Sequence, residues 1–562
     1  MDLYAEMAER LPPTYLSVPE SYGGWSYYSK TPARRDLPLF YRRREAGGEE
    51  QLLLDLGEAA DRHGYAALGA FSVSQDQSLL AYTLDTSGTE RWELIVREIG
   101  SGHVVSRVPD VLNAEWSEGH SLLYTQIDER GRAHKAALHG QGDRLCPGWL
   151  LVVANSALPS RSLGLYAIAE SSLPAPQSTW IELVRPDAEV AIEDVDVFKD
   201  WVVVYQRRDA MPHVKSFRAG LNREGETETP LLEVQRVPQL PFAGSPCAVR
   251  PLPNRVESTM CVPLQMPLHC EQRFATTRDG TLVPLTLTYR DGHPSLAQSP
   301  MLAIVYGAYG ACLKAEYQST HLPLLERGWV VALVHVRGGG ELGPAWHKAG
   351  ALAHKRRSSE DLADAVNSLH QMGISQPSLT TASAESAGDW GALALGGAVN
   401  EASHLFAAVV MRVPFLDVLS SMVDPTLPLT VEVCRLPLCA SVACVEWLLL
   451  ALQEREEWGD PLSDTSALDA IKGFSPYEGL AAQRYPPMLL SAVENDTRVP
   501  FTQALRYLAR LRHRSRSVDS HAQPPQVLQF LSTGGHHGEG GRFRRLEHAA
   551  TELSFLLHAE EI

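Results

Sequence analysis

The sequence lacks any apolar run long enough to cross a lipid bilayer. The longest such run, at residues 442–452, is short and is interrupted by Glu446. Residues 1–12 have neither the basic nor the apolar part of a secretory signal peptide. We therefore expect a cytoplasmic protein with no integral membrane association.

Metal-binding and redox cysteine patterns are also missing. The chain has eight cysteines, but none forms a CxxC pair and none lies with histidines at the spacing of zinc ligands. This pattern indicates reduced, buried thiols in a cytosolic protein, with no metal site and no cofactor. The net charge of -17, with no basic stripe, argues against nucleic acid as a partner.

The first half of the chain has no long amphipathic helix. Strand-like runs at residues 79–83, 92–96, 121–125 and 201–205 alternate with turn residues such as those at 86–88. Many short strands predict an all-β domain, and the recurring strands that end in Tyr-Thr favour a β-propeller over a β-sandwich. At ~40–50 residues a blade, this region is long enough for about five blades.

From about residue 280 onward, strands alternate with helices. The strand candidates are residues 302–306, 330–334, 379–382, 407–411, 488–492 and 527–531, and helices are predicted at 359–372, with Ser359 as N-cap, and at 501–511. This alternation predicts an α/β domain with a mostly parallel, doubly wound sheet. Active sites in such sheets form at the carboxyl ends of the strands.

One segment of the second half has the form of a nucleophile elbow. A strand-like run leads into Ala384-Glu385-Ser386-Ala387-Gly388, and a helix of small residues follows. A serine on such a sharp turn between strand and helix stands exposed above the sheet. The turn needs small residues two positions before and after the serine, where Ala384 and Gly388 lie. Ser386 is therefore the candidate nucleophile.

A serine hydroxyl needs a base within hydrogen-bond reach and a carboxylate that orients this base. Asp496, between a strand and a helix, is the candidate acid, and Glu494 is a weaker rival. The candidate base is His537, in a glycine-rich loop after the last strand. Its neighbour His536 is a competitor that the sequence does not eliminate.

These residues predict acyl transfer. His537 takes the proton of Ser386, the alkoxide attacks a carbonyl carbon, and Asp496 holds the imidazole. The resulting oxyanion needs hydrogen-bond donors, and the backbone N–H of Ala387 is one by its position in the elbow. The hydroxyl of Tyr306, at the end of a predicted strand, is the candidate for the second. The alternative is a core tyrosine without a catalytic role.

Together these motifs resemble the prolyl oligopeptidase family of serine hydrolases, above all its prolyl endopeptidase-like and oligopeptidase B branches. The most specific match is Arg-Gly-Gly-Gly-Glu at residues 337–341, followed by Trp-His-Lys at 346–348. Residues 305–310, 495–500 and 535–538 and the elbow at Ser386 also match. The resemblance implies a β-propeller over an α/β-hydrolase domain, with the active site between them.

The resemblance also implies domain boundaries and one more site residue. It implies an N-terminal segment at residues 1–30 that packs on the hydrolase domain, a propeller at 31–265 and a catalytic domain at 266–562. Arg498 matches the family arginine that binds a substrate carbonyl. No tryptophan matches the one that stacks on proline in true prolyl enzymes, so we expect no proline specificity. Esterase or thioesterase activity is associated with the prolyl endopeptidase-like branch.

Three features depart from the family pattern. Residues 433–453 interrupt it, and joining 430–432 to 454–461 restores it; we interpret this segment as an insertion, either a retained intron read in frame or a genuine helical segment. Asp389 and Trp390 follow the elbow where the family has glycine, which threatens the position of the nucleophile. The propeller region also suits about five blades rather than the seven of the family.

Two functions are consistent with these motifs. The first is a serine hydrolase that acts on short peptides, esters or thioesters. The second is a catalytically weak or inactive family member that works as a protein-binding scaffold. A third interpretation, a propeller binding protein with an unrelated α/β domain, requires that the serine, aspartate and histidine lie far apart.

Overall fold

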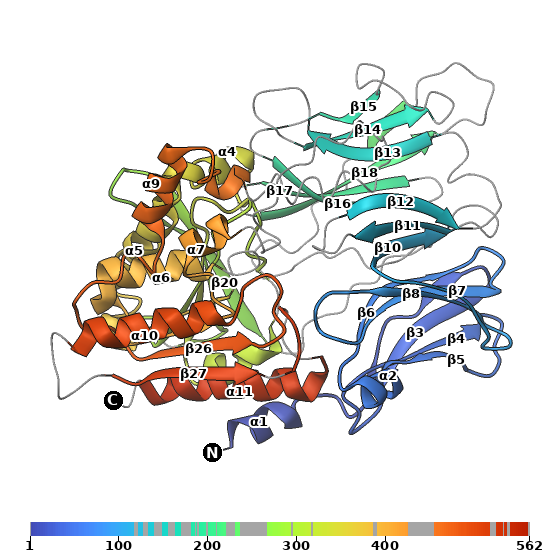
Figure 1. Ribbon diagram of the computed structural model, residues 1–562, viewed down its shortest axis with the longest axis horizontal. Coiled ribbons are helices and arrows are strands. Elements are labelled where there is room, and N and C mark those ends of the chain that lie inside the picture. Colours follow the sequence, from blue (N-terminus) through green and yellow to red (C-terminus); the bar gives the residue numbers. More distant parts are fainter. Residues whose placement is uncertain are drawn as a thin grey trace.

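A computed structural model describes most of the chain. The described residues are 2–116, 122–127, 133–139, 149–155, 163–169, 181–185, 187, 190–197, 201–208, 211–220, 231–235, 267–293, 296–315, 318–385, 391–424, 455–516, 524–531, 533–536 and 540–559. They form a domain of small antiparallel sheets beside a domain built around one large sheet (Figure 1). Within these residues, no helix is both long and apolar enough to cross a membrane.

The described part of the first domain contains five antiparallel sheets. They comprise β1–β5, β6–β9, β10–β12, β13–β15 and β16–β19. The strands are β1 Tyr15–Leu16, β2 Glu20–Tyr22, β3 Trp25–Thr31, β4 Leu39–Arg44, β5 Gln51–Asp55, β6 Ala67–Val73, β7 Leu79–Asp85, β8 Glu93–Glu98, β9 Val104–Val108, β10 Val111–Trp116, β11 Leu122–Ile127, β12 Ala133–His139, β13 Trp149–Asn155, β14 Leu163–Ala169, β15 Ile181–Val184, β16 Val190–Val197, β17 Trp201–Arg208, β18 Met211–Gly220 and β19 Leu231–Gln235. Helix α2, Leu56–His63, connects the first two sheets.

Neighbouring sheets pack face to face because their strands are apolar on both faces. In β7, Leu80, Tyr82 and Leu84 belong to a core shared with the first sheet. Ala81 of the same strand belongs to a second core that includes Trp116 of the third sheet. Successive side chains of a strand point to opposite faces, so one strand contributes to both cores. This stacking confirms the predicted propeller.

The second domain is built on an eight-stranded sheet with the order β20-β21-β23-β22-β24-β25-β26-β27. The first two pairings are antiparallel, and all pairings from β23 to β27 are parallel. The strands are β20 Leu268–Thr276, β21 Leu282–Arg290, β22 Met301–Val305, β23 Val330–Val334, β24 Thr380–Glu385, β25 Ala408–Arg412, β26 Met488–Val493 and β27 Gln526–Leu531. The predicted mostly parallel sheet is confirmed.

Helices cover both faces of this sheet, which explains the continuous apolar runs of its central strands. Met301, Ala303 and Val305 of β22 face one core, whereas Leu302 and Ile304 face the other. The helices are α1 Leu3–Glu9, α3 Leu322–Glu326, α4 Pro344–Lys348, α5 Arg356–Gln371, α6 Ala392–Ala402, α7 Val418–Val423, α9 Thr465–Phe474, α10 Thr502–Arg516 and α11 Arg542–Ala559. Short 3₁₀ helices are η3 Ser319–His321, η4 Leu352–His354, η5 Pro377–Leu379 and η6 Ser403–Leu405.

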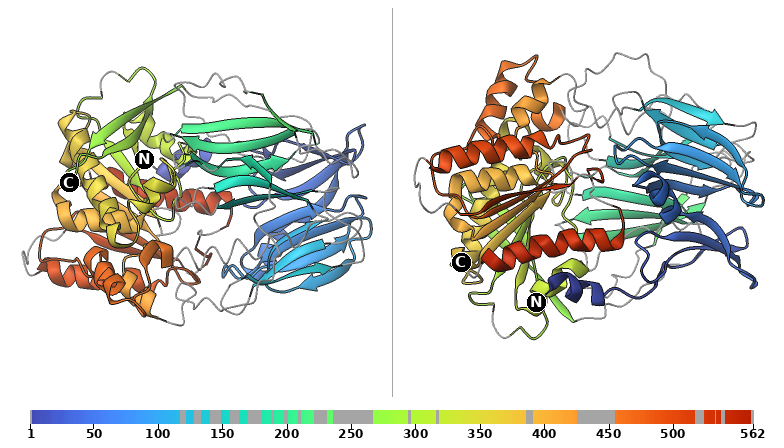
Figure 2. Two further views of the ribbon diagram at one scale, coloured as in Figure 1. Left: turned by 90° about the horizontal axis from the view of Figure 1, so that it is seen from above. Right: turned by 60° about the horizontal axis from the view of Figure 1, so that its bottom comes forward.

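The N-terminal helix belongs spatially to the second domain. Helix α1 lies beside α11 (Figure 2), and Met7 of α1 joins the core on that face of the sheet. Glu6 of α1 also pairs with Arg327, which follows α3, at 2.6 Å. Residue 30, the expected end of the N-terminal segment, lies in β3.

Two other local expectations concern a helix cap and an insertion. Ser359 is not an N-cap: α5 begins at Arg356, and η4 leads into it almost directly, so Lys355 takes the cap position without a side-chain bond to the helix. The segment at residues 433–453, interpreted as an insertion, lies outside the described residues.

Candidate active site

Two candidate site residues come from loops at the carboxyl edge of the large sheet. Asp496 follows β26 and precedes α10, and His536 follows β27. Because β26 and β27 are parallel neighbours, the loops after them emerge at the same edge of the sheet. The two side chains meet there, with 2.8 Å between Asp496 Oδ2 and His536 Nδ1.

The carboxylate of Asp496 is held in a fixed orientation. Its Oδ1 accepts the backbone N–H groups of Arg498 at 2.9 Å and Val499 at 2.8 Å. Its Oδ2 faces His536, and both paired side chains are almost fully buried. A carboxylate fixed in this way favours the tautomer in which Nδ1 of His536 carries the proton, which leaves Nε2 to exchange a proton with a nucleophile.

This pairing bears on the choice between the two histidines. The sequence favoured His537, but the carboxylate of Asp496 contacts His536, the competitor. His537 lies outside the described residues, as do Ser386 and Ala387. Glycines stand on both sides of the histidine pair, so backbone freedom did not discriminate between them. The loop also contacts the other domain, which no local pattern reveals.

That contact joins the backbone of Gly88, in the turn after β7, to Gly534 and Gly535. A Cβ on Gly88 would lie 2.5 Å from the carbonyl oxygen of Gly534, and one on Gly535 would lie 2.1 Å from the carbonyl oxygen of Gly88. Asp85 stiffens the turn by accepting backbone N–H groups from residues 87, 88 and 90. A rigid turn of the propeller therefore supports the loop that carries His536.

The same turn contacts Arg498, the candidate substrate-binding residue. Nε of Arg498 lies 2.9 Å from Oε2 of Glu90, although 408 positions separate them in the sequence. The sequence pointed to Arg498 but not to Glu90, because nothing local indicated a pairing over this distance. Glu90 thus places a propeller carboxylate beside the site and partly neutralises the cation there.

Tyr306, the candidate oxyanion donor, directly follows β22 and is buried, with an exposed fraction of 2%. Strand β22 is the parallel neighbour of β24, which ends at Glu385, one residue before the candidate nucleophile. Gly391 marks the return of the chain into α6. It has φ of +48°, and a Cβ there would lie 2.3 Å from the carbonyl oxygen of Tyr306. Glu385 and Gly391, the described residues on either side of the elbow, therefore lie at the same edge of the sheet as Tyr306.

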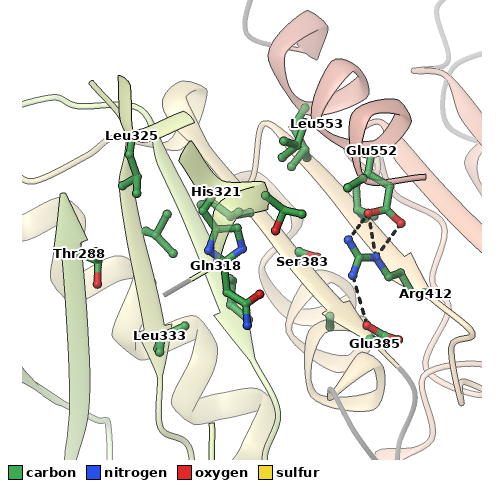
Figure 3. Close-up of a pocket in the computed structure, with 18 of the residues that line it drawn as sticks. Thr288, Gln318, His321, Leu325, Leu333, Ser383, Glu385, Arg412, Glu552 and Leu553 are labelled. Atoms are coloured by element: carbon green, nitrogen blue, oxygen red, sulfur yellow. Dashed lines mark hydrogen bonds and ion pairs between the residues drawn. The ribbon is translucent and has the colours of Figure 1, made fainter. Parts of the chain in front are cut away.

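A separate cavity of about 190 Å³ lies on the α11 side of the sheet (Figure 3). Its walls are mostly aliphatic, and His321 points into it. Burial, and to a smaller extent Arg412, lowers the pKa of His321 to about 4. At one end Arg412 bridges Glu552 at 2.7 Å and Glu385 at 3.3 Å. This bridge ties the end of β24 to α11.

The chemistry open to this site is proton transfer between a nucleophile and an oriented histidine. A buried Asp–His pair at the carboxyl edge of a mainly parallel, helix-covered sheet is typical of an α/β-hydrolase. Among the residues that the structure describes, no three His, Cys, Asp or Glu side chains come together as a metal site would require.

Comparison with known proteins gives the family. A model of the N-terminal β-propeller domain of prolyl oligopeptidase matches residues 1–143, and the prolyl oligopeptidase family model matches residues 316–440 and 437–561. These matches together cover more than half of the chain, which therefore belongs to the prolyl oligopeptidase family.

Individual relatives match different shares of the chain. The prolyl endopeptidase-like protein of Xenopus laevis is 41% identical over 51% of this chain. The match covers only 38% of the length of that relative. Protease 2 of Moraxella lacunata is 24% identical over 99% of this chain and 89% of its own length. Oligopeptidase B from Leishmania major has a similar structure, with a TM-score of 0.78, 20% identity and coverage of 100% of this chain and 88% of its own. At that identity the structural match shows the fold alone.

Proposed function

We propose that this protein is a serine hydrolase that cleaves short peptides, esters or thioesters through an acyl-enzyme. The observation that carries the proposal is the buried contact between Asp496 and His536 at the carboxyl edge of the sheet. Ser386 is the proposed nucleophile, and His536 replaces His537 as the proposed base.

In the proposed reaction, Nε2 of His536 takes the proton from the hydroxyl of Ser386 as its oxygen attacks the substrate carbonyl. Asp496 stabilises the imidazolium that forms. The hydroxyl of Tyr306 and the N–H of Ala387 donate to the oxyanion of the tetrahedral intermediate. His536 then protonates the leaving group, and water hydrolyses the acyl-enzyme by the reverse sequence of proton transfers.

Arg498 is proposed to bind a carbonyl of the substrate. Its guanidinium adjoins Glu90 through Nε, so an incoming carbonyl meets a cation that is already oriented. Because Glu90 neutralises part of its charge, the site suits a neutral carbonyl better than a free carboxylate. Protease 2 and the dipeptidyl aminopeptidase BI of Pseudoxanthomonas mexicana, both matched over 99% of this chain, support a peptide substrate.

The location and partners belong to the same proposal. We place the enzyme in the cytoplasm because its cysteines lack a disulfide pattern. The proposed partner is the small substrate itself. No observation specifically favours the alternative role as a protein-binding scaffold.

The test is labelling of the purified protein with a fluorophosphonate probe, which reacts with activated serines. Wild type should be labelled, and Ser386→Ala should abolish labelling. His536→Gln should slow it at least about a thousandfold, whereas His537→Gln should stay within about threefold of wild type. The opposite ranking would restore His537 as the base. Absence of labelling in well-folded wild type, with and without residues 433–453, would refute the hydrolase.

A further inference from the structure

A buried charged network lies behind the candidate oxyanion loop, and the proposed reaction does not yet use it. At its centre is Lys355, at the start of α5, with an exposed fraction of 1%. Its Nζ donates to the carbonyl oxygen of Gly307 at 2.7 Å, and it also bonds to Glu457. A fully buried lysine is rare unless it is paired, so both contacts require an explanation.

Glu457 completes the network from a distant part of the chain. It is fully buried and bonds to Lys355 through one oxygen and to His347 through the other, at 2.6 Å. Burial alone would oppose its ionisation, but Lys355 and His347 together outweigh burial and hold the pKa of Glu457 below its usual range. The ammonium of Lys355 also lies 4.9 Å from the ring centroid of Trp458. The lysine is therefore confined on several sides.

Gly307, the residue that Lys355 binds, has little room to move. It has φ of +78°, and a Cβ there would lie 2.3 Å from Cγ2 of Val336. The hydroxyl oxygen of Ser358 lies 3.2 Å from the same carbonyl oxygen, but its shorter contact, at 2.6 Å, is its donation to the carbonyl oxygen of Arg337. The peptide between Gly307 and Ala308 is thus oriented mainly by the ammonium group.

Tyr306 is constrained from its other side as well, because Gly391 packs against its backbone. The next aromatic residue, Tyr309, accepts a hydrogen bond from Trp458 Nε1 at 3.1 Å. Residues 306–309 are therefore connected to Glu457 and Trp458. These two residues lie shortly after residues 425–454, which the structure does not describe. These contacts fix the backbone from which the Tyr306 side chain projects.

We propose that Lys355, held by Glu457 and His347, is a positioning residue that fixes the Gly307–Ala308 peptide and so, through the adjoining Gly307, aims the Tyr306 hydroxyl at the developing oxyanion. This inference rests on the proposed function for the role of Tyr306. The ammonium acts through the backbone rather than through its charge, since Glu457 neutralises it at contact distance. A donor displaced by ~1 Å forfeits most of its effect in the transition state.

The test must avoid leaving Glu457 as an unpaired buried charge, because such a variant fails to fold for an unrelated reason. Burial lowers the pKa of Lys355, so in Glu457→Gln alone the lysine can lose its unpaired charge and still donate an N–H to Gly307. Lys355→Met combined with Glu457→Gln removes both charges together with that bond. The comparison of these two proteins isolates the contact, and Lys472→Met, at an exposed lysine of α9, is the matched control.

The rate of fluorophosphonate labelling is measured for both proteins, each with and without Tyr306→Phe. Adding Lys355→Met should slow labelling about tenfold when Tyr306 is present and less than about twofold when Tyr306→Phe is present, because the donor is then already absent. Equal slowing in both backgrounds, or none in either, overturns the proposal. Lys472→Met should match wild type, and a slowing there would show that loss of any lysine affects the rate.

A second measurement separates this inference from the proposed function. If wild type is not labelled at all, hydrogen exchange of the amides at residues 306–311 decides. Lys355→Met with Glu457→Gln should speed their exchange about tenfold over Glu457→Gln, with no change in β7. Unchanged exchange at 306–311 would overturn the positioning role, whatever the activity of the protein.

Discussion

The contact between Gly88 and the histidine loop supports a prediction whose size follows from the geometry. A Cβ on Gly88 would lie 2.5 Å from the carbonyl oxygen of Gly534, about 1 Å closer than an ordinary carbon–oxygen contact. The obstructing atom belongs to the backbone, so no side-chain rotation relieves it. In Gly88→Ala the loop must move by about 1 Å. Because such a displacement of a catalytic group costs up to about a hundredfold in rate, we expect fluorophosphonate labelling to slow about ten- to a hundredfold.

Gly102→Ala is a matched control for this change. Gly102 has φ of +72°, close to the +77° of Gly88, but nothing lies within 4 Å of the position of its Cβ. Both variants therefore carry the backbone strain of a left-handed residue, about 1–2 kcal/mol, and only one displaces the loop. Labelling rates and thermal unfolding are measured for both. If Gly88→Ala is labelled as fast as Gly102→Ala, the propeller turn does not position His536.

Two further predictions concern stability measured by urea unfolding. Burial lowers the pKa of His321 to about 4, below its unfolded value of 6.5, so the unfolded chain binds the proton more tightly. Between pH 7 and pH 5 the free energy of unfolding of wild type should therefore fall by about 2 kcal/mol more than that of His321→Gln. Equal falls in the two proteins would contradict this. Asp361 is fully buried and contacts Arg337 at 2.6 Å, and Arg337 also pairs with Asp279, so Asp361→Asn should cost about 3 kcal/mol, the lower end of the range for a broken buried pair. Asp364→Asn, which removes one of the two carboxylate partners of the exposed Arg278, should cost less than about 1 kcal/mol, and equal costs would refute the distinction.

The sequence was most informative where strands are buried on both faces. Strand β23 has the predicted bounds, Val330–Val334, and the other parallel strands begin within about one residue of prediction. Continuous apolar runs between turn residues determine such strands locally. Helix α5 shows the limit of this reasoning, because Ser359 had the residue type of an N-cap but the helix had already begun in the preceding turn.

The candidate site was predictable only in part, because its geometry depends on contacts between distant segments. Asp496 could be located from the strand before it and the helix after it. The contact between Asp496 and His536 and the packing of Gly534 and Gly535 against the propeller both join segments that are far apart in the sequence. The pairing of Lys355 with Glu457 spans 102 positions and has no local signature. Charged residues of this kind look like ordinary surface residues in the sequence.

The two sides of the proposed site are held by different domains. The propeller turn at Gly88 supports the loop of His536, whereas the oxyanion side is supported within the second domain by Lys355 and Glu457. Among the described residues, no residue takes part both in the contact at Gly88 and in the contacts of Lys355 and Glu457. Separation of the domains would therefore remove one support of the base, which Asp496 still contacts, and leave the Tyr306 backbone in place. The propeller is thus part of the apparatus that assembles the proposed catalytic pair, and more than a cover over the hydrolase domain.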